Sequence, residues 1–299
     1  MESGQWIQEL CLFITASIVC AIGLQTNLFI VGVSAIDRLN RRPLTPADLL
    51  ITAIATSRIL FQFMTLLDLF WITFNGVGSA TFAIPSAMIV SSSAYSNIWL
   101  SVLQSVFYSL KISNFHNILF LCLKKIILQR VLGLAIMFVV MSICYALADI
   151  LTFIMTSPNN STQDGGTNHM VQFIRYRVFL VWNVLPFLFY VVSCFALLGS
   201  LCRHMYRMRR EDNVTAHLDT YYRTIKFTVA SFCCFALYVS FNMFGNFLLS
   251  FPALLLVGNC FLMLHSLYLI YMTPQLRAQV IKILNVMTRA ATRNFGVHD

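Results

Sequence analysis

The sequence predicts an all-α protein, a single bundle of seven transmembrane helices with its N terminus outside the cell and its C terminus inside. Three observations lead to this prediction. The 299 residues are 59% hydrophobic and 10% charged, with a mean hydropathy of +0.77, whereas about a quarter of the residues in soluble domains are charged. The apolar residues gather in seven long runs. The basic residues gather on one side of these runs.

Each run is long enough to cross a bilayer as a helix, which takes roughly 20 apolar residues because the hydrocarbon core is about 30 Å thick. The first run is too long for a signal-peptide core and follows no basic residue, so we expect it to be retained as a helix. Membrane strands are not expected, since strands alternate over segments of about ten residues. The predicted helices are 10–36, 49–72, 80–110, 126–155, 178–202, 225–249 and 253–272, all in one domain, 1–299.

The first three runs differ in the polar residues that they carry. The first contains Asn27 near its middle, and the second contains Arg58 and Asp68. The third has no charged residue or histidine from 79 to 110, and it ends at Lys111. An uncharged stretch of this length that stops at a lysine is typical of a helix reaching the face of a membrane.

The last four runs also have basic residues or uncharged segments at their ends. The fourth begins after the pair Lys124 and Lys125 and contains Asp149. The fifth begins directly after Arg177, and the segment 250–258, where the sixth run gives way to the seventh, is uncharged. The segment 73–85, where the second gives way to the third, is also uncharged. Both segments are therefore expected on the outer side of the membrane.

Orientation follows from the positive charge. All but three of the 20 Lys and Arg residues lie in or beside the first, third and fifth connections and the tail; the exceptions are Arg58, Arg175 and Arg177. These connections should be cytosolic, because positive charge is retained on that side. The net charge of +9 is therefore a topology signal. No nucleic-acid partner is expected, since the basic residues are spread over four sites at the membrane surface.

The sequence does not predict an enzyme. It contains no His-x-x-x-His metal pair, no glycine-rich phosphate loop and no Ser, His and Asp set at one depth. No cofactor or metal is expected. None of the nine cysteines falls in an outer connection, so we expect no extracellular disulfide.

Arg58 is the most informative intramembrane residue. It lies about nine residues into the second run, or roughly 14 Å deep. A cation there costs several kcal/mol unless it has a partner or a function. Asn27 is the expected neighbour, because its side-chain carbonyl accepts a guanidinium hydrogen bond, and Ser266 of the last run is a second candidate. Two interpretations stay open: a clasp that only locks the helices together, or a switch that uses the same contacts.

Four segments carry a resemblance to the vertebrate type 2 (bitter) taste receptors. The segment "NLFIVGVSAIDRLNRRPLTPADLLITAIATSRI" (27–59) resembles the first two helices of that family, and "WLSVLQSVFYSLKISNFHNILFLCLKKII" (99–127) resembles the third. The segment "LPFLFYVVSCFALLGSLCRHMYRM" (185–208) is similar to the fifth helix, and "LHSLYLI" (264–270) to the seventh, with His265 and Ser266. The resemblance covers nearly the whole chain in order.

The resemblance implies a G protein-coupled chemoreceptor of the plasma membrane that binds small bitter compounds and activates a cytosolic heterotrimeric G protein. In this family the inner end of the third helix meets the G protein. The implied contact residues are Tyr108, Lys111, Lys124, Lys125, Leu201, His204 and Arg207. A second interpretation of the lysines is that they only anchor the helices at the membrane surface.

The chain departs from the family at two places. Residues 261–263 read "FLM" where members commonly have a Tyr-Pro, so the last helix is expected to lack a kink. Val90 stands where many members have a pocket tryptophan, so that ligand contact is not carried over. The agonist and the oligomeric state remain open.

Helical periodicity predicts a ligand-binding wall in the outer half of the bundle. It comprises Ala87, Val90, Ser91, Ala94, Trp182, Val239, Asn242, Leu255 and Asn259. Asp68, near the outer boundary, is either a counter-ion for cationic agonists or a water-facing helix end, and Tyr95 is a candidate hydrogen-bonding neighbour for it. It lies ten residues beyond Arg58, more than two turns away, so the two cannot pair.

Two other classes of protein were considered. A vomeronasal type 1 receptor is a related seven-helix alternative, and the motifs of the second and fifth helices argue against it. A small transporter or channel is the other, with Ser91, Ser92 and Ser93 lining a path. An odd number of non-repeating helices with few intramembrane acids makes a transporter less favoured.

Glycosylation is predicted at Asn159 or Asn160, which form overlapping sequons in the one sizeable outer connection. Asn213 should stay unmodified, because its sequon falls on the cytosolic side. Replacing both Asn159 and Asn160 with Gln should abolish the glycosidase-sensitive mobility shift of the expressed chain. A shift that persists in the double variant would show that the topology of this connection is wrong.

Overall fold

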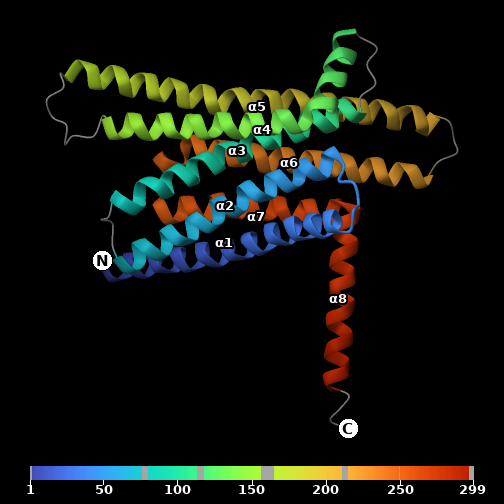
Figure 1. Cartoon of the computed structure of the whole chain (residues 1–299), viewed down its shortest axis with the longest axis horizontal. Coiled ribbons are helices and arrows are strands. Elements are labelled where there is room, and N and C mark those ends of the chain that lie inside the picture. The colour runs from blue at the N-terminus through green and yellow to red at the C-terminus, as the bar shows by residue number, and fades with distance from the viewer. Residues whose placement is uncertain are drawn as a thin grey trace.

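The computed structural model describes residues 2–75, 80–112, 118–155, 165–210, 215–248 and 250–295, and nearly all of these residues are helical. The helices pack side by side except for the last, which leaves the bundle at the end opposite the N terminus, and the first part of α4, which also turns outward there (Figure 1). They are α1 (Glu2–Leu39), α2 (Pro46–Asn75), α3 (Ala80–Ile112), α4 (Ile118–Met155), α5 (Gly165–Arg210), α6 (Thr215–Leu248), α7 (Phe251–Met272) and α8 (Pro274–Phe295).

All seven predicted helices are present, and several are longer than predicted. The largest extension is that of α5, which continues past both predicted ends because helices extend beyond the apolar run into polar sequence. The helix α4 also begins earlier, and it bends at Arg130, whose φ of −113° and ψ of 19° lie outside the helical region. Hydropathy therefore locates the membrane-crossing parts of these helices but not their ends.

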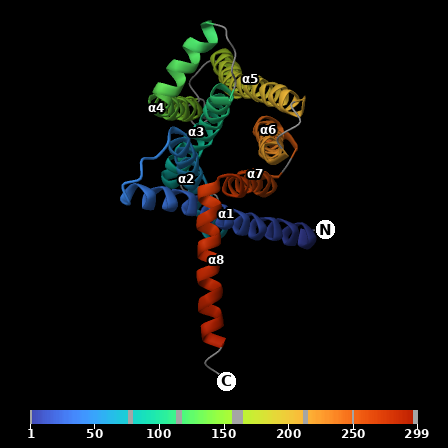
Figure 2. The same cartoon turned by 90° about the vertical axis from the view of Figure 1, so that its right-hand side faces the viewer.

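The eighth helix was not predicted. Thr273 adopts an extended conformation, and Pro274 has no backbone N–H to continue the ladder of α7. The chain turns there, and α8 runs away from the bundle at a steep angle (Figures 1 and 2). Its sequence has four basic and no acidic residues, so it never forms the apolar run by which the other helices were found. A basic amphipathic helix with this direction suits the inner membrane surface.

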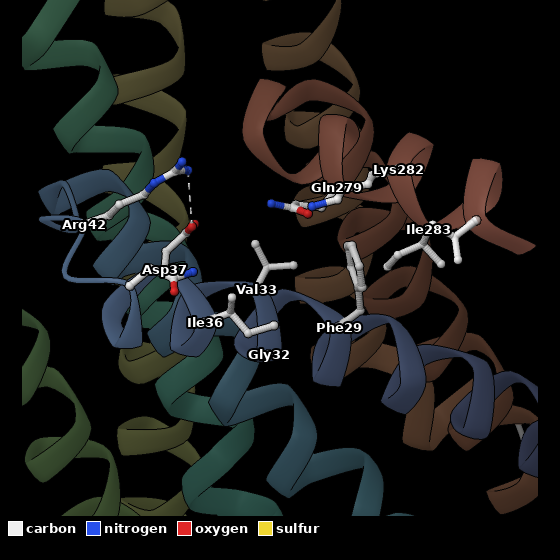
Figure 3. A pocket seen from close by; sticks show the side chains of 11 residues that line it. Phe29, Gly32, Val33, Ile36, Asp37, Arg42, Gln279, Lys282 and Ile283 are labelled. Carbon is white, nitrogen blue, oxygen red and sulfur yellow. Dashed lines mark ion pairs between the residues drawn. The ribbon is translucent and has the colours of Figure 1, made fainter.

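A groove of about 570 Å³ separates α8 from the inner end of α1. Its walls are formed by apolar side chains such as Phe29 and Val33 of α1 and Ile283 of α8, while Gln279 and Lys282 of α8 lie at its polar rim (Figure 3). Arg42 pairs with Asp37 at 3.6 Å at one end of the groove. This ion pair fixes the chain where it leaves α1.

Six helices of the described part are long and apolar enough to cross a membrane, and α3 is not among them. The reason is its place in the bundle. It packs against α2, α4 and α5, and it buries Ser93, Ser96, Asn97, Ser101 and Gln104. A helix surrounded by protein has less need of apolar residues than one facing lipid.

Three apolar clusters hold the helices together. One joins α3, α5, α6 and α7 around Tyr190, Phe235 and Leu262. A second joins α2, α3 and α4 around Ile54 and Leu100. A third joins α1, α2, α7 and α8, where Leu276 fastens the start of α8. The outer surface carries many exposed Leu, Ile, Val and Phe side chains, as a bundle in lipid requires.

Gly23 leaves room for the side-chain amide of Gln62, which accepts a hydrogen bond from Asn27 where α1 and α2 pack. A Cβ at this position would collide with the side-chain amide of Gln62, with Cδ at 3.0 Å, whereas a Cβ at Gly32 of the same helix would meet nothing. Gly23→Ala should destabilise the protein by about 1–3 kcal/mol through overpacking. Gly32→Ala should be neutral or stabilising by up to about 1 kcal/mol, because alanine favours the helix.

Thermal unfolding of the two purified variants measures this difference. Equal unfolding midpoints for Gly23→Ala and Gly32→Ala would contradict the predicted contact.

Candidate functional site

A buried hydrogen-bond network around Arg58 joins α1, α2, α3 and α7. Arg58 Nε donates to Asn97 Oδ1 of α3 at 2.8 Å, and Nη1 donates to Ser266 Oγ of α7 at 2.8 Å. Ser266 Oγ in turn donates to Asn27 Oδ1 of α1 at 2.9 Å. Arg58 is 2% exposed. One guanidinium therefore holds together groups from three other helices.

The network continues along α1 towards the outer side. Asn27 Nδ2 donates to Gln62 Oε1 at 3.1 Å and to the Gly23 carbonyl at 2.8 Å. Cys20 Sγ lies 3.1 Å from the Gln62 carbonyl and 3.5 Å from Asn259 Oδ1 of α7. Polar contacts thus link α1, α2 and α7 over several turns. In an apolar bundle such contacts define the relative register of the helices.

The network differs in two respects from the expected one. Asn27 reaches Arg58 through Ser266 instead of accepting its hydrogen bond directly. Asn97 was not among the candidate residues, although it binds Arg58 most directly. An asparagine inside an uncharged membrane run needs a hydrogen-bonding partner. The presence of Asn97 in such a run is the sequence feature that could have identified it. His265 makes no described hydrogen bond through Nδ1.

Small cavities lie inside the bundle next to this network. One of about 20 Å³ is lined by Arg58, Asn97 and His265, together with aromatic side chains of α6 and α7. A second, of about 30 Å³, lies between α3, α5, α6 and α7 and shares Ser101 and His265 with the first. A third, of about 280 Å³, opens at the start of α8 and shares Tyr108 with the second.

The predicted G protein-facing residues lie at the end of the bundle where α8 begins. Tyr108 lines the cavity of about 280 Å³ together with Thr273 and Pro274. Leu201 of α5 is buried, so its side chain packs within the bundle instead of facing the cytosol. Lys111, Lys125 and His204 are exposed and Lys124 is half-buried, while the side chain of Arg207 lies outside the described residues.

Lys111 also lies over the ring of Phe107, with Nζ 6.0 Å from the ring centroid. This contact suits a side chain that anchors the helix at the membrane boundary.

The predicted ligand-binding residues occupy varied environments. Val239 is 3% exposed within an apolar cluster, and Asn259 is 1% exposed and bonded within the network. Ala87 is exposed, whereas Val90, Ser91, Ala94, Asn242 and Leu255 are half-buried. Asn242 interacts with Tyr238 and leaves its buried Nδ2 without a partner. Val239 and Asn259 thus have structural contacts of their own.

Trp182 belongs to an aromatic stack that joins α3, α4 and α5. Its ring is parallel to that of Tyr145, with centroids 4.7 Å apart, and Tyr145 meets Tyr95 edge-on at 4.6 Å. Trp99 contacts Trp182 at 5.8 Å and stacks on Phe138 at 4.9 Å. The Nε1 atoms of Trp182 and Trp99 are buried without a described partner. Tyr145 was not singled out because aromatic residues in apolar runs look alike in sequence.

Asp68 lies on a half-buried face of α2 beside the hydroxyl of Ser86 on α3. The sequence had suggested Tyr95 as its neighbour, and Tyr95 instead contacts Tyr145. Asn159, Asn160 and Asn213 lie outside the described residues.

Loss of the central cation is predicted to disrupt the network. Arg58→Ala strands Asn97 and Ser266, and an unsatisfied buried group costs about 1–3 kcal/mol. Surface delivery of the protein should fall, and so should its thermal stability. The double variant Arg58→Ala, Ser266→Ala should be less impaired than the sum of the single variants, because the two residues share one bond. Strictly additive losses, or wild-type delivery of Arg58→Ala, would contradict a coupled network.

Comparison with known proteins agrees with this architecture. The chain matches the taste receptor protein (TAS2R) family model over residues 5–288. It is 28% identical over 279 residues to human "Taste receptor type 2 member 50", covering 88% of this chain and 92% of that protein. It is 30% identical over 197 residues to "Taste receptor type 2 member 19" of Pan paniscus, covering 63% of this chain and 64% of the relative.

The fold resembles that of squid rhodopsin, whose crystal structure aligns with a TM-score of 0.65 at 12% sequence identity, covering 94% of this chain and 86% of that chain. The two alternative classes are not favoured by these matches, and the resemblance noted in the sequence is confirmed. Because the family model spans almost the whole chain, this protein belongs to the type 2 taste receptor family and is a multi-pass plasma-membrane chemoreceptor, not an enzyme.

Proposed function

We propose that this receptor binds small, mostly apolar bitter compounds, protonated amines among them, between the outer halves of its helices. The aromatic stack of Tyr95, Tyr145 and Trp182 is the observation that carries the proposal. Aromatic faces bind apolar rings, and they attract cations through their quadrupoles. The carboxylate of Asp149 lies near Tyr95, and Asp68 lies nearer the outer boundary of α2.

The stack also supports a correction to the predicted ligand wall. Trp182 remains a ligand candidate, while Val239 and Asn259 are better described as structural residues, because both are almost fully buried in other contacts. Asn242 stays a candidate, since a buried amide without a partner is a group that a polar ligand can satisfy. Ala87, Val90, Ser91, Ala94 and Leu255 remain proposed positions at the edge of the site.

Signalling requires that the ligand bind two conformations with different affinity, since equal affinity shifts nothing. We assign the change between them to the Arg58 network, because it is the polar junction of four helices and adjoins cavities that extend towards the start of α8. His265 lines two of these cavities without a partner for Nδ1. A side chain with unused hydrogen-bonding capacity suits a role in the alternative state.

The G protein is proposed to bind at the mouth lined by Tyr108 and Thr273. The exposed side chains of Lys111, Lys125 and His204 belong to the helices that meet at that end of the bundle. Lys124 and Arg207 are proposed to contact the G protein as well. Leu201 of α5 is buried, and its proposed role is to hold α5 in place beside this mouth.

Calcium imaging tests the function directly. The chain is expressed with a promiscuous G protein, and responses to a panel of bitter compounds are recorded with and without that G protein. Responses that need the G protein support the proposal. An ion current that persists without it would favour a channel instead. Tyr145→Ala should weaken aromatic agonists, while Phe153→Ala, an exposed position on the same helix, is the matched control.

Asp68 is predicted to pair with cationic agonists. Asp68→Asn keeps the size and polarity of the side chain but removes its charge. A direct ion pair in a partly wet pocket contributes on the order of 1 to 3 kcal/mol, so amine agonists should weaken by roughly 5- to 150-fold while neutral agonists barely change.

Ser86→Ala is the control for this variant, because it removes the neighbouring hydroxyl and leaves the carboxylate in place. Dose–response curves for a matched amine and neutral agonist supply the measurement. Equal potency changes for both classes would rule out the counter-ion role.

A further inference from the structure

The charge of Arg58 has no counter-charge among the described residues that surround it. The titratable groups that face it are the phenols of Tyr190 and Tyr238, the thiol of Cys234 and the imidazole of His265, and none of these is a carboxylate. The two groups that accept its hydrogen bonds, Asn97 and Ser266, are neutral as well. A cation that is 2% exposed and lacks an anion is costly, because charge removed from water needs compensation.

The guanidinium also has hydrogen-bond donors to spare. An arginine offers five N–H groups. The described bonds use Nε and one hydrogen of Nη1. The remaining donors of Arg58 have no acceptor within the part of the chain that the structure describes. They belong to a side chain that lines a cavity rather than one that is packed on all sides.

That cavity suits a guest of about one atom. Its volume is about 20 Å³, slightly above the roughly 10–15 Å³ that admits a water molecule. Besides Arg58 it is bordered by His265, whose buried Nδ1 lacks a partner, and by Tyr238, whose hydroxyl interacts with Asn97 and Asn242. The rest of the wall is polar in part, with Asn97, Ser101 and Cys234, and apolar in part, with Phe235, Phe261 and Leu262. The guanidinium gives this wall unused donors and a positive charge, which disfavour a cation.

We propose that this cavity binds a small monovalent anion, chloride in the cell, as the missing counter-ion of Arg58. The guanidinium supplies the charge, and the apolar side chains of Phe235, Phe261 and Leu262 separate the pair from water on one side. A water molecule in the same place would satisfy hydrogen bonds but would leave the positive charge uncompensated. The two occupants therefore differ in whether the stability of the receptor depends on the anion.

A route connects the site with the cytosolic end of the bundle. The Arg58 cavity shares Ser101 and His265 with its neighbour. That neighbour shares Tyr108, Leu197, Phe227 and Thr228 with the cavity that opens at the start of α8. Anions are expected to exchange along this row when side chains at the junctions move. The proposal concerns the stability of the resting bundle and does not depend on which agonist the receptor binds.

Thermal unfolding of the purified full-length receptor tests the proposal. The unfolding midpoint is measured as chloride replaces gluconate at constant ionic strength and constant potassium. At chloride tenfold above its dissociation constant, the ratio of folded to unfolded receptor should rise about 11-fold, which corresponds to a midpoint shift of about 2–4 °C. Bromide should act like chloride. Sulfate should give no saturable shift, because it is too large for the cavity.

Two variants locate the effect. Arg58→Gln removes the charge, and its midpoint should no longer respond to chloride. Asn97→Asp places a fixed carboxylate where Asn97 Oδ1 now lies, 2.8 Å from Arg58 Nε, so it should match or exceed the wild-type midpoint in gluconate and ignore chloride. Lys282→Gln, which removes an exposed cation of α8, should keep the wild-type response.

The outcomes are decisive in either direction. Equal wild-type midpoints in chloride and gluconate at every concentration would overturn the proposal in favour of water. So would a chloride response in Asn97→Asp as large as that of the wild type, since the effect would then lie elsewhere on the protein. If Arg58→Gln does not fold, Asn97→Asp alone decides.

Discussion

A single buried guanidinium constrains much of this bundle. Arg58 sits where α2 meets α1, α3 and α7, and its hydrogen bonds reach Asn97 and, through Ser266, Asn27. Apolar contacts between helices tolerate small slides, because one leucine resembles another to its neighbour. A guanidinium does not tolerate such slides, because its N–H donors point in fixed directions. The axial register of these four helices is therefore set by polar geometry, and the apolar clusters fill the space that this register leaves.

The same constraint explains the composition of α3. This helix supplies Asn97 to the cation and lies between α2, α4 and α5, so few of its side chains meet lipid. Its serine and glutamine side chains are buried against other helices, whereas on a lipid-facing helix they would contact hydrocarbon. Its aromatic residues pack against α4 and α5 through Trp99 and Tyr95. Within the described residues, the bundle helix that is missing from the candidate membrane spans is consequently one that the bundle buries deeply, with an unbroken buried run from Ser96 to Gln104.

Much of the fold could be predicted from sequence, and the site only partly. Spans of apolar residues must cross the bilayer as helices, so the seven predicted helices are present. The helix α8 was not predicted, because its basic residues interrupt any apolar run. A helix on the membrane surface does not need such a run. The cost of burying polar groups predicted that Arg58, Asn27 and Ser266 interact. It did not predict that Ser266 lies between the other two. That order depends on side-chain directions, as does the neighbour of Asp68, which is Ser86 and not Tyr95.

Position in the bundle gives the Arg58 network its functional interest. Aromatic side chains of α3, α4 and α5 lie towards the outer side of it, and the cavity lined by Tyr108 and Thr273 lies towards α8. A closely packed interior does not deform continuously, so a small displacement is transmitted only where an element has two discrete arrangements. Hydrogen bonds that can exchange partners provide such arrangements, and the buried atoms His265 Nδ1 and Gln62 Nε2, which lack hydrogen-bond partners, are the groups available for exchange. A ligand that moves α3 relative to α2 by even part of a turn must alter the Arg58–Asn97 bond, because that bond joins the two helices directly. The Arg58–Asn97 bond therefore lies between the proposed ligand site at the aromatic stack and the proposed G protein site near α8.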